Sequence, residues 1–268
     1  INCDTFSANL VSMGNITSNS VLDNAIFNIN GTNQIDFEIS QNSIDTNSSL
    51  LIDATATLIA TGSIYRNTIK VESVLDFRGS TIYLFYENII TNNCAIDLGG
   101  IATNLFHNNS FCNSTYSCPT KSVGTIANIV YNEINMSIIT IGASANINTF
   151  TLNQLYDGAL FLNKVGVFSH NTVNHGSQIT AADLSDLSEI SFNNLDNNSF
   201  VYFVNTIMSQ AFSMNIVNNS SNIQLTNFTH GNYFTNVTLN NTSQFIISDV
   251  NDIKNSILYI NIDNSSSF

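Results

Sequence analysis

Apolar residues along this chain mostly alternate with polar ones in short bursts of four to six residues. Clear examples occupy 35–39, 200–204 and 257–262. The bursts are rich in β-branched and aromatic residues and are separated by Asn, Ser, Gly and Asp, a composition typical of short strands joined by turns. Helical spacing is nearly absent, and only 181–187, with two Leu three apart, predicts a turn or two of helix. The pattern therefore predicts an all-β protein.

The bursts recur with a drifting period of 20 to 24 residues, which is typical of a solenoid. The segment 218–221 aligns with 240–243, and an apolar strand follows each of them. A second series of Asn residues with the same period contains Asn171, Asn194 and Asn215. In the first third of the chain, Asn residues recur every 20 or 21 residues, at Asn47, Asn67, Asn88 and Asn108. Asn suits tight corners because it tolerates the left-handed backbone conformation, and its amide can hydrogen-bond along a stack.

We therefore expect a single parallel β-solenoid over 1–268, with three short strands in each 20–24-residue coil and Asn-rich turns. A loop excursion is expected around 107–122, which contains the only proline, Pro119. The sequence begins at Ile1 with no Met and no hydrophobic leader, which fits a processed secreted protein or a fragment of a longer chain.

The recurring Asn–apolar coils, for example at 171–174 and 194–200, resemble those of the right-handed parallel β-helix, or pectin-lyase-like, superfamily. Gly99-Gly100-Ile101 and the segment 158–161 also resemble the Gly-rich coil starts of bacterial surface β-helix repeats. The resemblance covers nearly the whole chain, but it implies an architecture and no active site. The competing leucine-rich repeat would need a regular Leu ladder, which this sequence lacks.

Charge narrows the choice of partners. Charged residues are 9% of the 268, and six Lys and Arg stand against nineteen Asp and Glu, for a net charge of −13. The basic residues are scattered, so neither nucleic acid nor an anionic membrane surface is an expected partner. No stretch approaches the length of a transmembrane helix, so membrane insertion is not expected. With so few charges, solubility would depend on the 45 Asn and other polar groups, on glycans, or on burial in an assembly.

Four cysteines allow three pairings. Cys112 and Cys118 flank a short polar loop, and a local disulfide between them is favoured over free thiols. Cys94 lies about one coil earlier and is a second candidate partner. Cys3 is separated from Cys94 by too many coils to form a disulfide with it. Cys3 would therefore bond to a cysteine of a neighbouring chain or of a segment outside this sequence. The Cys spacing does not fit zinc, and no other cofactor is expected.

The N-x-[ST] pattern marks potential glycan sites on a secreted protein. It occurs only slightly more often than this Asn content would produce by chance. The favoured sites are those in the expected loop and at the tail, followed by others in the first half: Asn108, Asn113, Asn264, Asn15, Asn30, Asn47 and Asn135.

A search for catalytic residues finds no constellation. Parallel β-helices often cleave polysaccharides, but this chain lacks an Asp-Asp pair, a Gly-His-Gly and nearby basic residues. Asp36 and Glu38 would share a strand face, whereas Asp183, Asp186 and Glu189 are candidates for carbohydrate or calcium binding. His170 and His175 are expected as ladder members, and no nucleotide or hydrolase motif is present. The protein is therefore not expected to be an enzyme.

These observations leave an extracellular structural or adhesive glycoprotein as the leading interpretation. It would be a subunit of a surface filament, appendage or coat, built by solenoid stacking between copies or neighbouring subunits. The alternative is a carbohydrate-binding or polysaccharide-cleaving β-helix, such as a viral or phage spike. Ice or mineral binding would need a Thr-x-Thr repeated on consecutive coils, and the Thr-x-Thr at 55–57 is not repeated in this way.

Overall fold

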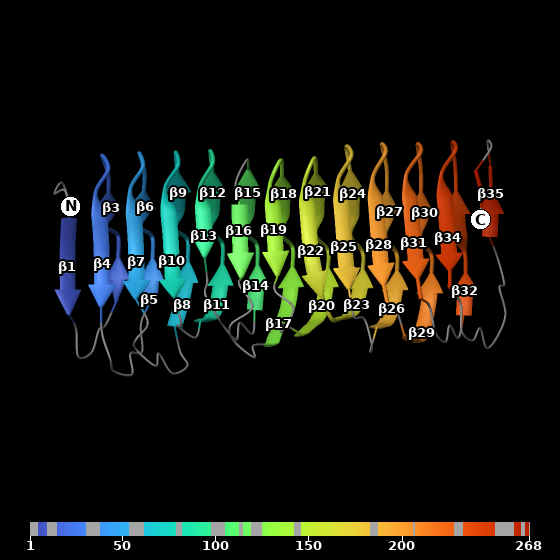
Figure 1. Ribbon diagram of the computed structural model, residues 1–268, viewed down its shortest axis with the longest axis horizontal. Helices are drawn as coiled ribbons and strands as arrows, with labels where there is room; N and C mark the ends of the chain where they lie inside the picture. The colour runs from blue at the N-terminus through green and yellow to red at the C-terminus, as the bar shows by residue number, and fades with distance from the viewer. Residues whose placement is uncertain are drawn as a thin grey trace. The chain divides into compact units, whose positions relative to one another are not determined.

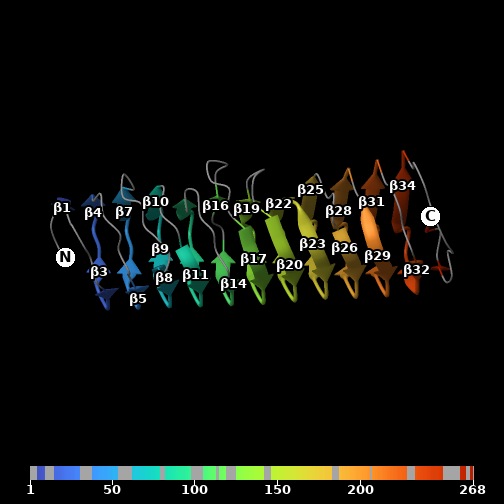
Figure 2. The ribbon, with the colours of Figure 1, turned by 90° about the horizontal axis from the view of Figure 1, so that it is seen from below.

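The computed structural model describes 5–9, 15–30, 38–53, 62–78, 82–97, 105–112, 115–118, 125–141, 146–182, 187–205, 207–227, 233–249, 260–263 and 266–267. The chain forms two compact units. Unit 1 comprises Ile1–Ala127 and Asn135–Ala145, and unit 2 comprises Asn128–Ile134 and Asn146–Phe268. Each is built from three parallel sheets, and within each unit strands of the same sheet lie side by side (Figures 1 and 2).

In unit 1 the first sheet has the order β1 (Thr5–Asn9), β4 (Ile26–Asn30), β7 (Ser49–Asp53), β10 (Val74–Arg78), β13 (Ala95–Asp97), β16 (Thr115–Cys118) and β19 (Ile138–Ile141). The second sheet has the order β2 (Ile16–Thr17), β5 (Glu38–Ser40), β8 (Gly62–Tyr65), β11 (Ile82–Tyr86) and β14 (Leu105–His107). The third has the order β3 (Ser20–Val21), β6 (Ser43–Ile44), β9 (Thr68–Lys70), β12 (Ile89–Thr91) and β15 (Ser110–Cys112).

In unit 2 the first sheet has the order β22 (Ala159–Asn163), β25 (Gln178–Ala182), β28 (Phe200–Val204), β31 (Asn222–Thr226) and β34 (Gln244–Ser248). The second has the order β20 (Asn146–Thr151), β23 (Val165–Ser169), β26 (Leu187–Ser191), β29 (Met208–Ser213) and β32 (Tyr233–Thr235). The third has the order β21 (Gln154–Tyr156), β24 (Thr172–Asn174), β27 (Asn194–Leu195), β30 (Ile216–Val217), β33 (Val237–Leu239) and β35 (Ile260–Ile262). Two strands, β17 (Thr125–Val130) and β18 (Glu133–Asn135), have residues in both units.

Each coil thus contributes one strand to each sheet, which confirms the predicted parallel β-solenoid with Asn-rich turns. The alternation of apolar and polar residues has its physical basis here, because successive side chains of a strand point to opposite faces. In β28, Val201 and Phe203 are buried while their neighbours are partly exposed. Phenylalanine rings stack from coil to coil inside each unit, as in Phe85 on Phe106 at 5.1 Å between ring centroids.

Asparagines form the first of two polar ladders, and all of its members except the half-buried Asn19 are buried. In unit 1 it runs through Asn19, Asn42, Asn67, Asn88 and Asn109, and in unit 2 through Asn132, Asn153, Asn171, Asn193 and Asn215. At Asn67, Nδ2 donates to Oδ1 of Asn88 at 3.1 Å and to the carbonyl oxygen of Ile39 at 2.9 Å. Most of these amides therefore join a coil to both of its neighbours, and their hydrogen bonds offset the desolvation cost of burying an amide.

A second ladder, mostly of serine, follows the other tight corner. Its buried members are Ser48, Ser73, Ser137, Ser177, Ser199, Ser221 and Ser243, and Cys94 occupies the same position in its coil. The Oγ of Ser199 donates to the carbonyl oxygen of Asp196 at 2.6 Å, and the Oγ of Ser221 accepts from the N–H of Ser199 at 3.1 Å. This ladder closes each corner and joins it to the next coil.

Several predicted details change. Asn194 was predicted to belong to the same series as Asn171 and Asn215. The structure shows that its neighbour Asn193 is the ladder member. Asn47 belongs to the other corner, where it has a φ of 56°. The predicted helical turn at 181–187 is bounded by strands, because Ala182 ends β25 and Leu187 begins β26. The expected loop at 107–122 contains β15 and β16, and its 113–114 and 119–122 lie outside the described residues.

Candidate functional site

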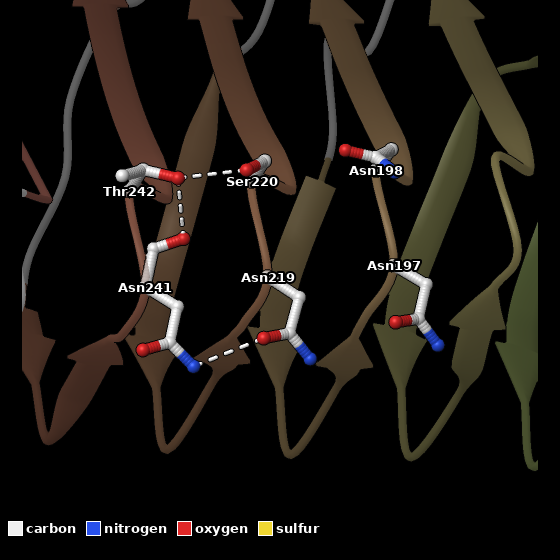
Figure 3. Close-up of a pocket in the computed structure, with 6 residues that line it drawn as sticks. All are labelled: Asn197, Asn198, Asn219, Ser220, Asn241 and Thr242. Carbon is white, nitrogen blue, oxygen red and sulfur yellow. Dashed lines mark hydrogen bonds between the residues drawn. The ribbon is translucent and has the colours of Figure 1, made fainter.

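A hollow on the surface of unit 2 is lined by the second tight corner of three coils. Its lining residues are Asn197, Asn198, Asn219, Ser220, Asn241 and Thr242 (Figure 3). All six have positive φ, from 50° to 64°, a conformation that Asn tolerates better than other non-glycine residues. Each of these three coils therefore presents two polar residues at the same place.

Most polar groups of the hollow are bonded along the row. Nδ2 of Asn241 donates to Oδ1 of Asn219 at 2.9 Å, and the hydroxyls of Ser220 and Thr242 lie 2.7 Å apart (Figure 3). Nδ2 of Asn219 in turn donates to Oδ1 of Asp196 at 2.5 Å. The hollow offers uncharged donors and acceptors at regular spacing, which suits hydroxyl-rich ligands, and its lining contains no group that would act as an acid, base or nucleophile.

A second group of side chains lies at the end of the second sheet of unit 1. The rings of Tyr65, Tyr86 and His107 stack with centroid separations of 4.8 and 5.1 Å. The hydroxyl of Tyr65 donates to the carboxylate of Glu38, whose Oε1 also accepts from Ser40 at 2.7 Å. The ring faces within the stack cover one another, so both faces of the middle ring, Tyr86, are closed to a sugar.

Hydrogen bonding and burial shift the pKa values in this stack. The hydroxyls of Tyr65 and Ser40 lower the pKa of Glu38, and the same bond raises the pKa of Tyr65. Burial raises the pKa of Tyr86 and lowers that of His107. These shifts stabilise the ordinary charge states of Glu38 and Tyr65, so they do not create an activated acid or base.

The one salt bridge among the described residues is also here. Nε of Arg66 lies 2.6 Å from Oε2 of Glu87, and this bond raises the pKa of Arg66. The guanidinium carbon of Arg66 lies 5.8 Å from the centroid of the Tyr65 ring. The pairing neutralises Arg66, which therefore contributes little as a site for an anionic sugar.

The predicted carboxylate candidates are only partly placed. Glu189 lies in β26, half-buried, and its carboxylate accepts from the hydroxyl of Ser191. Asp183, Asp186 and Asp36 lie outside the described residues, so whether the first two approach Glu189 stays untested. Among the residues that the structure describes, no three His, Cys, Asp or Glu side chains gather as a metal site.

The two predicted ladder histidines both contact aromatic rings. His170 stacks on Phe192 with 4.6 Å between centroids, and His175 lies 6.0 Å from Tyr156 in a tilted arrangement. Both have positive φ, 55° and 53°, and both are exposed at corners. Their contacts are those of corner residues stacked along the coils.

The predicted glycan sites differ in their exposure and in whether the structure describes them. Asn15, Asn47 and Asn108 are exposed and Asn135 is half-exposed, whereas Asn113 and Asn264 lie outside the described residues and the side chain of Asn30 is not described. The structure also exposes sequons that the sequence pattern ranked below these, at Asn219, Asn227, Asn236 and Asn241. Their position in a corner after each strand is what brings them to the surface. Glycosylation of any of them stays a prediction.

The four cysteines also differ in their burial and in whether the structure describes their side chains. Cys94 is a free, buried thiol whose Sγ donates to the carbonyl oxygen of Thr91 at 2.9 Å, and burial raises its pKa. Cys112 ends β15 and is half-buried, and Cys118 ends β16, where its side chain is not described. Cys3 lies outside the described residues. The Cys112–Cys118 disulfide therefore stays a prediction.

Parallel coils of three strands, joined by Asn and Ser ladders, define the class of protein as a parallel β-solenoid. No protein-family model, curated protein or solved structure matches the chain. Within the described part of the chain, no helix has the length and apolar character required to cross a membrane.

Proposed function

We propose that this protein is an extracellular structural or adhesive glycoprotein, a subunit of a surface filament, appendage or coat. The observation that supports this proposal most directly is the polarity of the asparagine ladder. At six described ladder positions the Asn donates forward to the next coil's Oδ1 and backward to a carbonyl oxygen of the previous coil, as Asn171 does to Asn193 and Phe150. A head-to-tail contact between subunits would repeat the same bonds without any new chemistry.

Such a contact is heterologous and does not close, so it generates filaments rather than a fixed oligomer. The proposal includes the finer resemblance to the right-handed pectin-lyase-like β-helices and an extracellular location. In that location the exposed sequons would carry glycans, and polar uncharged rows would keep the surface soluble.

Electron microscopy of the purified protein over a range of concentrations tests the proposal. We expect filaments whose fibre diffraction has a meridional reflection near 4.8 Å, the spacing of stacked strands. Single particles at all concentrations, with the mass of one chain by sedimentation, would overturn the assembly proposal.

The second candidate function is carbohydrate binding without cleavage, and the amide-lined hollow favours it. Its rows of amide and hydroxyl groups match the donors and acceptors of sugar hydroxyls. Glycan-array binding followed by calorimetry tests this candidate with Asn241→Ala in the hollow. The matched control is Asn227→Ala, at another corner. Like Asn241, Asn227 donates from Nδ2 to an Asn of the preceding coil, here Oδ1 of Asn205 at 2.8 Å. Loss of binding in the first variant alone would support the hollow as the site.

A further inference from the structure

Unit 2 carries a row of large side chains along the corner between its second and third sheets. We call this row the corner ridge, and its members are Tyr131, Leu152, His170, Phe192 and Met214. Each follows a strand of the second sheet, and these strands, β17, β20, β23, β26 and β29, are neighbours in that order (Figure 2). The backbone N–H of each member donates to the next coil at 2.9–3.3 Å, so the ridge advances by one coil per residue.

Both the backbone and the solvent disfavour these residue types here. All five have φ between 52° and 58°, where a bulky L-residue is strained. Exposed fractions are 59% for Tyr131, 38% for Leu152, 45% for Phe192 and 44% for Met214. An Asn or Ser at any of these positions would relieve both costs.

The same corner in unit 1 shows that the fold does not require apolar residues. The equivalent positions there are polar or charged, at Ser18, Gln41, Arg66, Glu87 and Asn108, and have similar φ values of 52° to 57°. Exposed, contiguous apolar surface on a soluble protein commonly marks an interaction site. Asn236, which follows β32 in unit 2, is polar as well and has a φ of 52°. The contrast between these polar positions and the five ridge positions therefore points to binding as the reason for the ridge.

We propose that the corner ridge is the contact through which two copies of this chain pair side by side, with their axes antiparallel. The period of the ridge supports a second copy as the occupant. Ridge side chains repeat at the spacing of stacked strands, about 4.8 Å. A second solenoid offers the same period over several residues, so ridge side chains of the two copies interdigitate along the whole row.

The few charged residues beside the corner ridge favour the antiparallel orientation of the two copies. Within two residues of any ridge member, the sequence has one carboxylate, Glu133, and no Lys or Arg. The ridge is therefore a place where two chains of net charge −13 can approach with little repulsion. Glu133 belongs to the Tyr131 end of the ridge, so antiparallel pairing places it opposite the Met214 end of the other copy, whereas parallel pairing would place the two Glu133 carboxylates together.

The size of the ridge predicts a weak pair. Five partly exposed side chains cover less than the roughly 800 Å² that each partner contributes to a standard interface. We therefore expect reversible dimers that strengthen as salt screens the net negative charge. This inference deepens the proposed function, on which it rests for the biological use of self-association, because lateral pairs would bundle head-to-tail filaments.

Sedimentation over a range of concentrations tests the pairing, with Leu152→Asn/Phe192→Asn as the variant. Asn fits the left-handed backbone better, so we expect at least tenfold weaker dimerisation with an unfolding temperature that is unchanged or higher. The matched control is Met136→Asn, which replaces a 53%-exposed Met with a φ of 45° at the other corner and should leave dimerisation unchanged. Equal dimerisation of variant and parent, or a clearly lower unfolding temperature of the variant, would overturn the proposal.

Two further results separate this inference from the proposed function. Filaments that form while ridge-dependent pairing is absent would overturn the inference and leave the proposed function standing. Ridge-dependent dimers that never extend to filaments would support the inference and overturn the filament proposal. For orientation, His170→Cys, at the middle of the ridge, should form a disulfide-linked dimer on mild oxidation, whereas Met214→Cys, at its end, should not. A disulfide-linked dimer of Met214→Cys, or none of His170→Cys, would overturn the antiparallel arrangement.

Discussion

Asn193 and Asn194 are adjacent in the chain and face opposite sides of the coil wall. Asn193 is 1% exposed, and its side chain makes four hydrogen bonds: it accepts two from Asn171 and donates one to Asn215 and one to the carbonyl oxygen of Phe168. Asn194 begins β27 with its side chain exposed. Two identical residues thus have unequal roles, set by the two-residue period of a strand.

This pair provides a direct test of the ladder. Asn193→Ala leaves the N–H and Nδ2 of Asn171, Oδ1 of Asn215 and the carbonyl oxygen of Phe168 short of partners in a buried setting. We expect the free energy of unfolding to fall by about 2–4 kcal/mol. Asn194→Ala should change it by less than about 0.5 kcal/mol. Urea denaturation followed by circular dichroism measures both, and equal losses would contradict a special role for the buried amide.

The fold was predictable from the sequence because two features appear directly as periodic patterns of residues. These are the alternation of apolar and polar residues within strands and the spacing of successive coils. Asn67-Thr68-Ile69 and Asn153-Gln154-Leu155 illustrate the rule that a ladder Asn precedes a buried apolar residue by two positions. Matching Asn residues without this rule placed Asn194 in the ladder. The exposed Asn of a corner and the buried Asn of a ladder are the same residue type, so only the spacing to the next buried side chain separates them.

The candidate surfaces were less predictable. Tyr65, Tyr86 and His107 are 21 residues apart in sequence, and nothing in the local pattern around each shows that their rings stack. The corner ridge was not predicted, because no local sequence pattern distinguishes Phe192 and Met214 from ordinary strand residues. Their contrast with Asn108 at the same corner becomes visible when equivalent positions of successive coils are compared. A search for bulky residues directly before each ladder Asn would have found the ridge.

Close approach of two coils predicts the effect of a glycine substitution. A Cβ added to Gly166 in β23 would lie 2.8 Å from the backbone oxygen of Asn148, inside contact distance. We expect Gly166→Ala to lower the free energy of unfolding by about 1–3 kcal/mol, because strand β20 must shift. Gly176→Asn is the control: it keeps a φ of +72° within reach of Asn, and the nearest atom lies 3.8 Å away. Thermal unfolding of both variants gives the comparison, and an unaffected Gly166→Ala would contradict the close contact.

The serine ladder predicts that Cys94 has a structural role. Its Sγ donates to the carbonyl oxygen three residues earlier, as the Oγ of Ser73 does to Lys70 at 2.6 Å in the preceding coil. Cys94→Ser should therefore retain the bond and change the free energy of unfolding by less than about 1 kcal/mol. Burial and a raised pKa should also make the native thiol slow to react with a thiol reagent until the protein unfolds. A large destabilisation, or fast labelling of Cys94 in the folded protein, would argue against this assignment.

Burial of His107 predicts a dependence of stability on pH. Desolvation lowers the pKa of His107 below its ordinary value of 6.5, against a smaller opposing effect of Glu87. The folded protein then binds fewer protons than the unfolded chain just below pH 6.5, so this contribution to stability is present above pH 6.5 and is lost as pH falls toward the folded-state pKa. The covering ring is that of Tyr86, whose centroid lies 5.1 Å from that of His107.

Two substitutions at the covering ring make this pH dependence testable. Unfolding midpoints measured between pH 7.5 and pH 5 should fall for the parent protein and for Tyr86→Phe, which keeps the stacked ring. The fall should be smaller for His107→Gln and for Tyr86→Ala, because the first removes the titrating group and the second exposes it to water. An NMR titration of the His107 ring provides the independent check: a midpoint above 6.5 in the folded protein would show that charge attraction outweighs burial, and the sign of the stability change would then reverse.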